Sequence, residues 1–183
     1  MSITFTNLSA ELTEVADKIR QTSVKIRSSN MGVGSGVIWQ SNGLIITNAH
    51  VAVSNKLTVE LWDGREFQGV PTKIDPTKDL AVLKIPTSNL HAATIRNSSE
   101  LRVGEIVLAV GNPLSDTNAV TTGIISQIQG NSLIADIQLF PGNSGGAMTD
   151  SLGRVVGINT MIAFGLAIAI STHTVEGFLE SVI

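Results

Sequence analysis

The stretch Phe140-Pro141-Gly142-Asn143-Ser144-Gly145-Gly146 sets one serine among glycines near the start of the last fifth of the chain. Glycine lacks a Cβ and adopts backbone conformations that other residues resist, so this run is a poor interior for a strand or a helix. It predicts a sharp, ordered turn that presents the hydroxyl of Ser144 to solvent. The backbone amides of such a turn, here Gly142, Asn143 and Ser144, favour an oxyanion hole, with the N–H groups of Gly142 and Ser144 pointing to one side.

A serine hydroxyl is a weak nucleophile, so this interpretation requires a general base elsewhere in the chain. The sequence has three histidines. His50 follows the apolar stretch 44–46, where a strand end can hold an imidazole rigidly. His91 lies in a polar segment, and His173 lies at an expected helix N-terminus, where the helix dipole disfavours a protonated ring. We therefore predict that His50 is the base.

The base needs a carboxylate that holds its tautomer and stabilises the imidazolium. Asp79 directly precedes the apolar run Leu80-Ala81-Val82-Leu83, where a carboxylate can be partly buried beside a core. The neighbours of four other aspartates are typical of turns. These are Asp63, Asp75, Asp116 and Asp150. Asp79 is accordingly the predicted orienting group.

Composition indicates one ordinary globular domain, or two small subdomains that share a core. The 183 residues are enough to bury a core, and 43% hydrophobic against 15% charged residues are typical of a folded protein. A formal net charge of -3 without a basic cluster argues against nucleic acid as a partner. The absence of cysteine excludes disulfides and thiolate metal sites. No signal peptide is visible, and the longest apolar run, residues 161–170, is too short to span a bilayer.

The hydrophobic pattern changes from helical to extended near residue 22. Apolar residues between 8 and 19 recur at helical spacing, with Ser9 as the candidate N-cap. From Ser23 onward the period is two, and Asn42-Gly43 and Asp63-Gly64 are hairpin signals. About a dozen short strands with frequent turn signals predict a sandwich or barrel. We expect strands at 23–27, 33–39, 44–47, 57–62, 65–70, 80–85, 106–110, 120–128, 132–137, 155–158 and 166–170.

A polar segment divides these strands into two sets. Residues 91–104 lack clear periodicity and form the expected linker between a first set in 23–90 and a second in 105–171. A helix is expected in 1–22 and another in 172–183, with Thr172 as its candidate cap. The apolar residues expected to dock the last helix on the second set are Val175, Phe178, Leu179 and Val182.

Several segments together resemble the HtrA/Deg family of trypsin-like serine proteases. In order and with compatible spacing they are Thr47-Asn48-Ala49-His50-Val51, Asp79-Leu80-Ala81-Val82-Leu83-Lys84-Ile85, Gly111-Asn112-Pro113 and Pro141-Gly142-Asn143-Ser144-Gly145-Gly146. Asp75-Pro76, Leu101-Arg102-Val103-Gly104-Glu105 and Val156-Gly157-Ile158-Asn159-Thr160 extend the likeness over nearly the whole chain. The resemblance implies an all-β fold of two six-stranded antiparallel β-barrels, with His50 and Asp79 on the first and Ser144 on the second, meeting in the cleft between them.

Three departures from the family pattern accompany this resemblance. We expect no PDZ module in this chain. The segments after Arg27 and after Ile162 are short where many relatives carry long regulatory loops, and Phe140 stands where many relatives have Asn. The resemblance further implies assembly through the N-terminal region as a homotrimer, and a location outside the cytoplasm, in the periplasm or cell envelope.

The same resemblance maps the pocket for the substrate residue before the cleaved bond (P1) onto Leu139, Ile162 and Phe164. All three are apolar, and residues 137–140 include no acid to pair with a substrate Lys or Arg. Cleavage after small or medium aliphatic residues such as Val, Ala, Ile or Leu is therefore expected. If Gln138 turned into the pocket, it would favour a polar P1 residue instead.

The sequence is also compatible with two other interpretations. The run Gly142-Asn143-Ser144-Gly145-Gly146 also matches the nucleophile elbow of α/β-hydrolases, with Asp150 and His173 in that class's chain order. That fold needs a parallel sheet, whereas only 39 residues follow Ser144 and the chain before it is rich in hairpins. A peptide-binding, chaperone-like module on the two-barrel fold is the non-enzymatic alternative. We predict an ATP-independent serine endopeptidase of unfolded polypeptides, without a metal or organic cofactor.

Overall fold

The computed structural model describes residues 5–28, 32–54, 56–111 and 119–180. Asn112, Pro113, Asp116 and Val182, which the sequence analysis named, lie outside these ranges. The first half of the described chain holds α1 (Phe5–Gln21), β1 (Ser23–Ser28), β2 (Gly32–Gln40), β3 (Leu44–Thr47), β4 (Leu57–Leu61), β5 (Glu66–Asp75) and β6 (Leu80–Lys84). The second half holds the 3₁₀ turn η1 (Ser98–Glu100), β7 (Ile106–Gly111), β8 (Ala119–Gln129), β9 (Ser132–Asp136), β10 (Ala147–Asp150), β11 (Val155–Ala163), β12 (Leu166–Ser171) and α2 (Thr172–Glu180).

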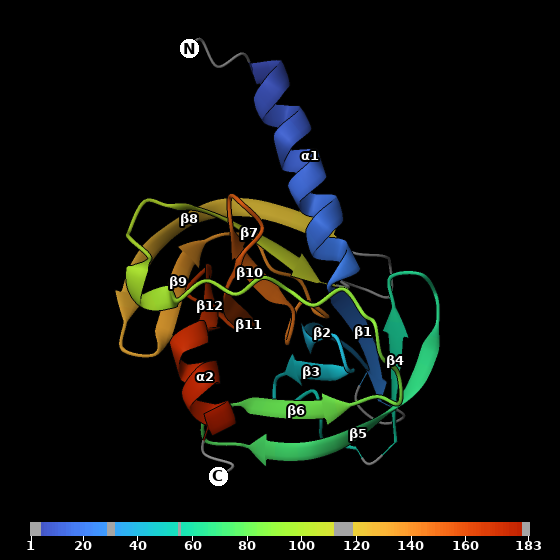
Figure 1. Ribbon diagram of the computed structural model, residues 1–183. Coiled ribbons are helices and arrows are strands. Elements are labelled where there is room, and N and C mark those ends of the chain that lie inside the picture. The colour runs from blue at the N-terminus through green and yellow to red at the C-terminus, as the bar shows by residue number, and fades with distance from the viewer. Residues whose placement is uncertain (1–4, 29–31, 55, 112–118, 181–183) are drawn as a thin grey trace.

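The strands close into two antiparallel barrels (Figure 1). The first has the order β1-β2-β3-β6-β5-β4 and the second β10-β11-β12-β9-β8-β7. Because successive side chains of a strand point to opposite faces, the period-two pattern fills each barrel with apolar side chains. In β4, for example, Leu57, Val59 and Leu61 are buried while the residues between them are only half-buried. The predicted two-barrel fold is confirmed.

A third apolar cluster joins the barrels to each other and to both helices. It combines Val37, Ile46 and Leu80 from the first barrel with residues of the second such as Val110 and Ile158. The helices contribute Ile19, Val175 and Phe178, all at most 2% exposed. Full burial of one such side chain stabilises by about 1.5–3 kcal/mol, so this cluster holds the two halves of the cleft in a fixed relation.

Both helix starts differ from the predicted caps. α1 begins at Phe5, four residues before Ser9, so Ser9 lies inside the helix and does not cap it. Figure 1 shows the N-terminal end of α1 projecting beyond the barrels, whereas Leu12 already packs against the cluster between them. At the other end, the hydroxyl of Ser171 accepts a hydrogen bond from the Thr174 N–H at 3.3 Å and caps α2. Thr172 instead binds the linker, donating to the Arg96 carbonyl at 2.7 Å and accepting from the Ser98 N–H at 3.0 Å.

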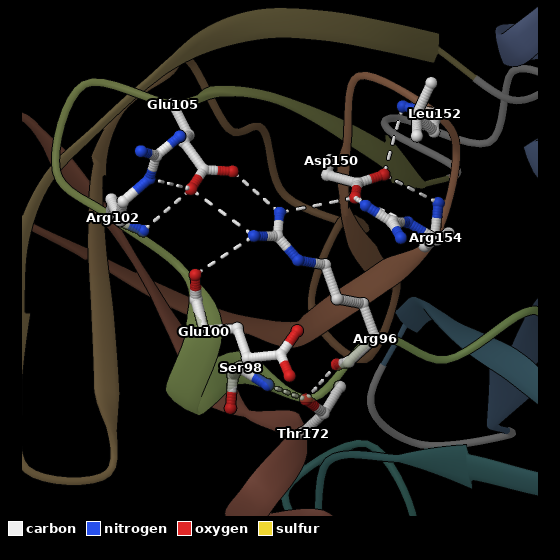
Figure 2. A network of polar contacts seen from close by, with 9 residues as sticks. All are labelled: Arg96, Ser98, Glu100, Arg102, Glu105, Asp150, Leu152, Arg154 and Thr172. Carbon is white, nitrogen blue, oxygen red and sulfur yellow. Dashed lines mark hydrogen bonds and ion pairs between the residues drawn. The ribbon is translucent and has the colours of Figure 1, made fainter.

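The polar linker is held in place by an ion-pair network (Figure 2). The guanidinium of Arg96, only 12% exposed, contacts Glu105 at 2.7 Å and Asp150 at 3.4 Å. The hydrogen bond from Arg96 lowers the pKa of Glu105 to about 2. Because folding lowers the pKa of Glu105 from its ordinary value of 4.5, the ionised carboxylate stabilises the fold when the pH is above 4.5. This contribution is lost as the pH falls toward 2. The linker is therefore an ordered strap along the second barrel.

The hydrophobic pattern of the sequence did not predict strand β10. This strand has four residues, all buried, and follows directly on the glycine-rich stretch. Its Thr149 and Asp150 are polar residues inside the fold, and so they break the apolar pattern by which the other strands were predicted. The strand matters for the site because it anchors the end of the loop that carries Ser144.

Candidate active site

The three predicted catalytic side chains come from three separate segments. His50 lies in the turn after β3, Asp79 directly precedes β6, and Ser144 lies in the loop between β9 and β10. His50 and Ser144 line one cavity of about 270 Å³, together with Gly34 and Gly142. The structure therefore brings residues of both barrels to one cleft.

His50 and Asp79 form a close pair. The imidazole Nδ1 lies 2.9 Å from both carboxylate oxygens of Asp79. The backbone N–H of His50 also donates to Asp79 Oδ1 at 3.1 Å. With Nδ1 held by the carboxylate, the protonated nitrogen is fixed on that side, and Nε2 is the nitrogen left to accept a proton.

Asp79 is held in turn by two residues that the sequence analysis did not single out. The Thr160 hydroxyl of β11 donates to Asp79 Oδ2 at 2.6 Å. The buried side chain of Asn48 donates to the Asp79 carbonyl at 3.0 Å. The φ angle of Asp79 is +53°, in the left-handed region, which aspartate tolerates better than most residues. These contacts from both barrels hold the carboxylate against His50.

The electrostatics of the pair favour a charged carboxylate beside a basic imidazole. The hydrogen bond to Asp79 raises the pKa of His50 above 6.5, against the lowering effect of its partial burial. Burial alone would raise the pKa of Asp79, but hydrogen bonds from His50 and Thr160 outweigh it, so this pKa lies below 3.8. Asp79 is therefore ionised at neutral pH, and it stabilises the imidazolium form of His50.

Ser144 is within the cleft, and its hydroxyl donates to the Thr160 carbonyl at 3.1 Å. No hydrogen bond joins the described side chains of Ser144 and His50. Hydrogen bonds of catalytic groups are often long or misaligned before substrate binds. The Ser144 hydroxyl must therefore leave the Thr160 carbonyl before its proton can pass to His50.

The backbone before Ser144 forms a tight turn. The Asn143 N–H donates to the Phe140 carbonyl at 3.0 Å, and Gly142 has φ +103°. A positive φ at the third residue is typical of a type II turn, and this conformation requires glycine there. Within the described part of the chain, neither the Gly142 nor the Ser144 amide donates a hydrogen bond. Two of the three amides predicted for the hole thus remain open, while the third, Asn143, is used within the turn.

Beside Ser144 lies a second cavity of about 200 Å³, the candidate P1 pocket. Two of the residues mapped to it, Leu139 and Ile162, line it, as does Met161, which was not predicted. Gln138 is exposed and does not line it.

Among the described residues, no cluster of three or more His, Cys, Asp or Glu side chains is arranged to hold a metal ion. No described helix is long and apolar enough to cross a membrane.

The structure leaves Phe164 outside this cavity. Ala163 pairs with Leu166, so Phe164 and Gly165 form a two-residue hairpin loop. Their φ angles of +52° and +80° are those of a type I′ turn, whose tip points away from the sheet. The Phe164 side chain is fully exposed. The family mapping gave the position in the sequence but not the turn that directs the side chain.

The competing histidine and aspartate candidates lie in other surroundings. His91 and His173 are exposed. The Asp150 carboxylate accepts from the N–H groups of Leu152 and Arg154 and ends β10, as expected for a turn residue. The α/β-hydrolase interpretation is excluded because both sheets are closed antiparallel barrels.

Comparisons with known proteins agree with this fold. Residues 34–158 match the family model described as a trypsin-like peptidase domain. Over 163 residues the chain is 41% identical to the mitochondrial serine protease HTRA2 of Drosophila ananassae, covering 80% of this chain and 38% of that protein. HTRA2 of Drosophila erecta is 40% identical, with 80% and 39% covered. The chain thus spans about two fifths of the length of these relatives.

Solved structures give the same result. The HtrA-type protease AlgW with a tripeptide superposes with a TM-score of 0.88 at 34% identity, covering 94% of this chain and 63% of that chain. AlgW with a decapeptide gives a TM-score of 0.85 at 30% identity, covering 93% and 66%.

Proposed function

Because this chain belongs to the trypsin-like peptidase family and its relatives are HtrA-type serine proteases, we propose that it is a serine endopeptidase. Ser144 is the nucleophile, His50 the general base and then acid, and Asp79 the group that orients His50. The observation that carries this proposal is the His50–Asp79 pair, joined by two 2.9 Å contacts, in the same cleft as Ser144.

The chemistry follows from these positions. The Ser144 oxygen attacks the carbonyl carbon of the substrate, its proton passes to His50 Nε2, and the carbonyl electron pair moves onto oxygen. The amides of Gly142 and Ser144 stabilise that oxyanion. The C–N bond then breaks, and His50 gives its proton to the leaving amine. Water repeats the sequence on the acyl-enzyme and releases the acid. All proton transfers use these side chains, so we propose a reaction without ATP, metal or organic cofactor.

The surroundings of Ser144 favour an extended polypeptide as substrate. β11 pairs with β12 as far as Ala163, whereas its pairing with β10 involves only residues 155–158. Within the described part of the chain, residues 160–163 therefore present an unpaired edge beside the cleft, to which a substrate strand can add by main-chain hydrogen bonds. Folded domains seldom offer such a strand, so we propose unfolded proteins as substrates.

Casein, which is unfolded, separates the protease from its non-enzymatic alternative. The proposal predicts fragments that accumulate with time and disappear when Ser144 is replaced by alanine. A chaperone-like module would instead protect an unfolded client from aggregation and leave casein intact. Intact casein after prolonged incubation with the folded protein would reject the enzyme.

The same digest tests the P1 preference. We expect fragments that end in Val, Ala, Ile or Leu, because Leu139, Met161 and Ile162 line the P1 cavity with apolar atoms. Discrimination among these residues should be low, since one methylene changes the free energy by only about 1–3 kcal/mol. Mass spectrometry of the fragments counts the P1 residues. Ile162→Ala should shift the distribution toward larger residues, while Ile128→Ala, exposed on β8, should leave it unchanged. Dominance of Lys and Arg would contradict the pocket assignment.

We also propose assembly as a homotrimer. A groove of about 420 Å³ lies between α1 and the second barrel, lined by Leu12, Ala16, Leu108 and Val120 among others. Beyond it the cross-strand pair Ile106 and Ile124 is exposed. We propose that a second copy of the chain packs on the apolar side chains of this face. Light scattering should give about three times the chain mass of 19.2 kDa, and Leu12→Asp should lower it. A parent mass near 19.2 kDa would contradict the trimer.

The family likeness supports a location outside the cytoplasm, and the curated relatives named above are mitochondrial. We propose an extracytoplasmic compartment, which cell fractionation with an antibody against the chain would test.

A further inference from the structure

Ser35 connects the first barrel to the loop that carries Ser144. It lies in β2 and is completely buried. Its hydroxyl donates to the Gly142 carbonyl at 2.7 Å. Its backbone N–H donates to the Ser144 carbonyl at 2.8 Å. One residue of the first barrel thus holds two peptide groups of the second.

These two bonds hold the peptide groups that flank one N–H donor of the proposed oxyanion hole and adjoin the other. The Gly142 carbonyl belongs to the peptide group that joins residues 142 and 143, and the Ser144 carbonyl to the one that joins 144 and 145. The peptide group 143–144 lies between these two and supplies the Ser144 N–H. The peptide group 141–142 directly precedes them and supplies the Gly142 N–H. The peptide group 142–143 is held at both ends, because its N–H also donates to Phe140 at 3.0 Å.

The loop needs such anchoring because of its composition. Gly142 and Gly145 both have positive φ angles, and glycine loses more conformational freedom on ordering than any other residue. The two segments also approach closely: a Cβ at Gly145 would lie 2.2 Å from the Ser35 carbonyl oxygen. That oxygen accepts from the Thr47 hydroxyl at 2.6 Å, three residues before His50. Ser35 therefore lies between the segment of the base and the segment of the nucleophile.

We propose that Ser35 is a positioning residue that orients the amides of Gly142 and Ser144 for the oxyanion, an inference that rests on the roles proposed above for those amides. Donors that are fixed before the reaction stabilise developing charge without reorganising during it. Ser35 touches no substrate. Its effect should therefore appear in the transition state and not in the binding of substrate.

The test compares Ser35→Ala with Ser23→Ala. Ser23 is an equally buried serine of the same barrel, and its hydroxyl bonds the Ile19 carbonyl at 3.0 Å, away from the cleft. For Ser35→Ala we expect kcat to fall about ten- to hundredfold with KM unchanged, since loss of one hole donor outright costs about 10²–10³. A peptide aldehyde, whose adduct carries an oxyanion, should lose affinity by a similar factor, and the matching peptide alcohol, which forms none, should bind as before. Ser23→Ala should keep the parental kcat, the parental KM and the parental affinities for the aldehyde and the alcohol.

Thermal unfolding first establishes that both variants are folded. Parental kcat and aldehyde affinity in folded Ser35→Ala, with Ser144→Ala inactive, would overturn the positioning role while leaving the proposed function intact. Parallel loss of aldehyde and alcohol binding would also overturn it, because that pattern indicates a merely structural effect. Activity in Ser144→Ala would instead reject the proposed function itself.

Discussion

Replacing Ser144 by alanine should abolish turnover and leave the fold intact. The change removes the atom proposed to form the acyl-enzyme, and in serine proteases such a loss lowers kcat by about 10⁶. Ser144 is only partly buried, and among the described residues its hydroxyl makes one hydrogen bond, to the Thr160 carbonyl. Its removal leaves no cavity in any of the three apolar clusters, so the midpoint of thermal unfolding should stay close to that of the parent.

The rates of hydrolysis of casein and of a peptide with Val or Ala at P1 measure the loss of turnover. Thermal unfolding of the same samples measures the stability of the fold. Ser126→Ala is the control, because Ser126 is an exposed serine on β8 away from the cleft. Near-parental hydrolysis by Ser144→Ala would remove Ser144 from the mechanism.

The second large effect is expected for Asp79→Asn. The amide keeps the shape of the side chain but cannot stabilise the imidazolium or hold the productive tautomer of His50, and in this class of enzymes the substitution lowers kcat by about 10⁴. It should also change the pH profile of kcat/KM. The rate of the parent should rise as His50 loses its proton, through a pKa that Asp79 raises above 6.5. Without the carboxylate this limb should move to lower pH.

Asp75→Asn is the matched control for this experiment. Asp75 lies four residues earlier, and its carboxylate pairs with Lys78 at 2.8 Å. This variant should keep the parental rate and profile. An Asp79→Asn enzyme within tenfold of the parent, with its acid limb in place, would contradict the orienting role.

Local pattern was enough to predict most of the secondary structure. The period-two runs and the glycine-containing turns located every strand except β10, whose buried Thr149 and Asp150 are not apolar. The pairing into two barrels came from the family resemblance, because periodicity indicates which face of a strand is buried but not which strand is its neighbour. His50, Asp79 and Ser144 were predicted because a catalytic residue type stands at a strand end or in a glycine turn.

The supporting contacts were not predictable in the same way. Ser35 meets Gly142 across 107 positions of the sequence, and Thr160 meets Asp79 across 81. Nothing in the sequence around these serine and threonine residues indicates such a contact, since hydroxyl side chains are common in strands and loops. Phe164 shows the opposite case: its position was mapped, but the hairpin turn directs it to solvent. Such contacts depend on how distant segments come together.

The proposed mechanism requires that Ser144 is a nucleophile activated within this fold. A fluorophosphonate reacts with such a serine and forms a stable phosphonyl adduct, and peptide mapping by mass spectrometry locates the modified residue. We predict one adduct per chain, on Ser144, formed by the folded protein, absent in Ser144→Ala and strongly slowed in His50→Ala. An adduct on a different residue, or no adduct on the folded parent, would contradict the account.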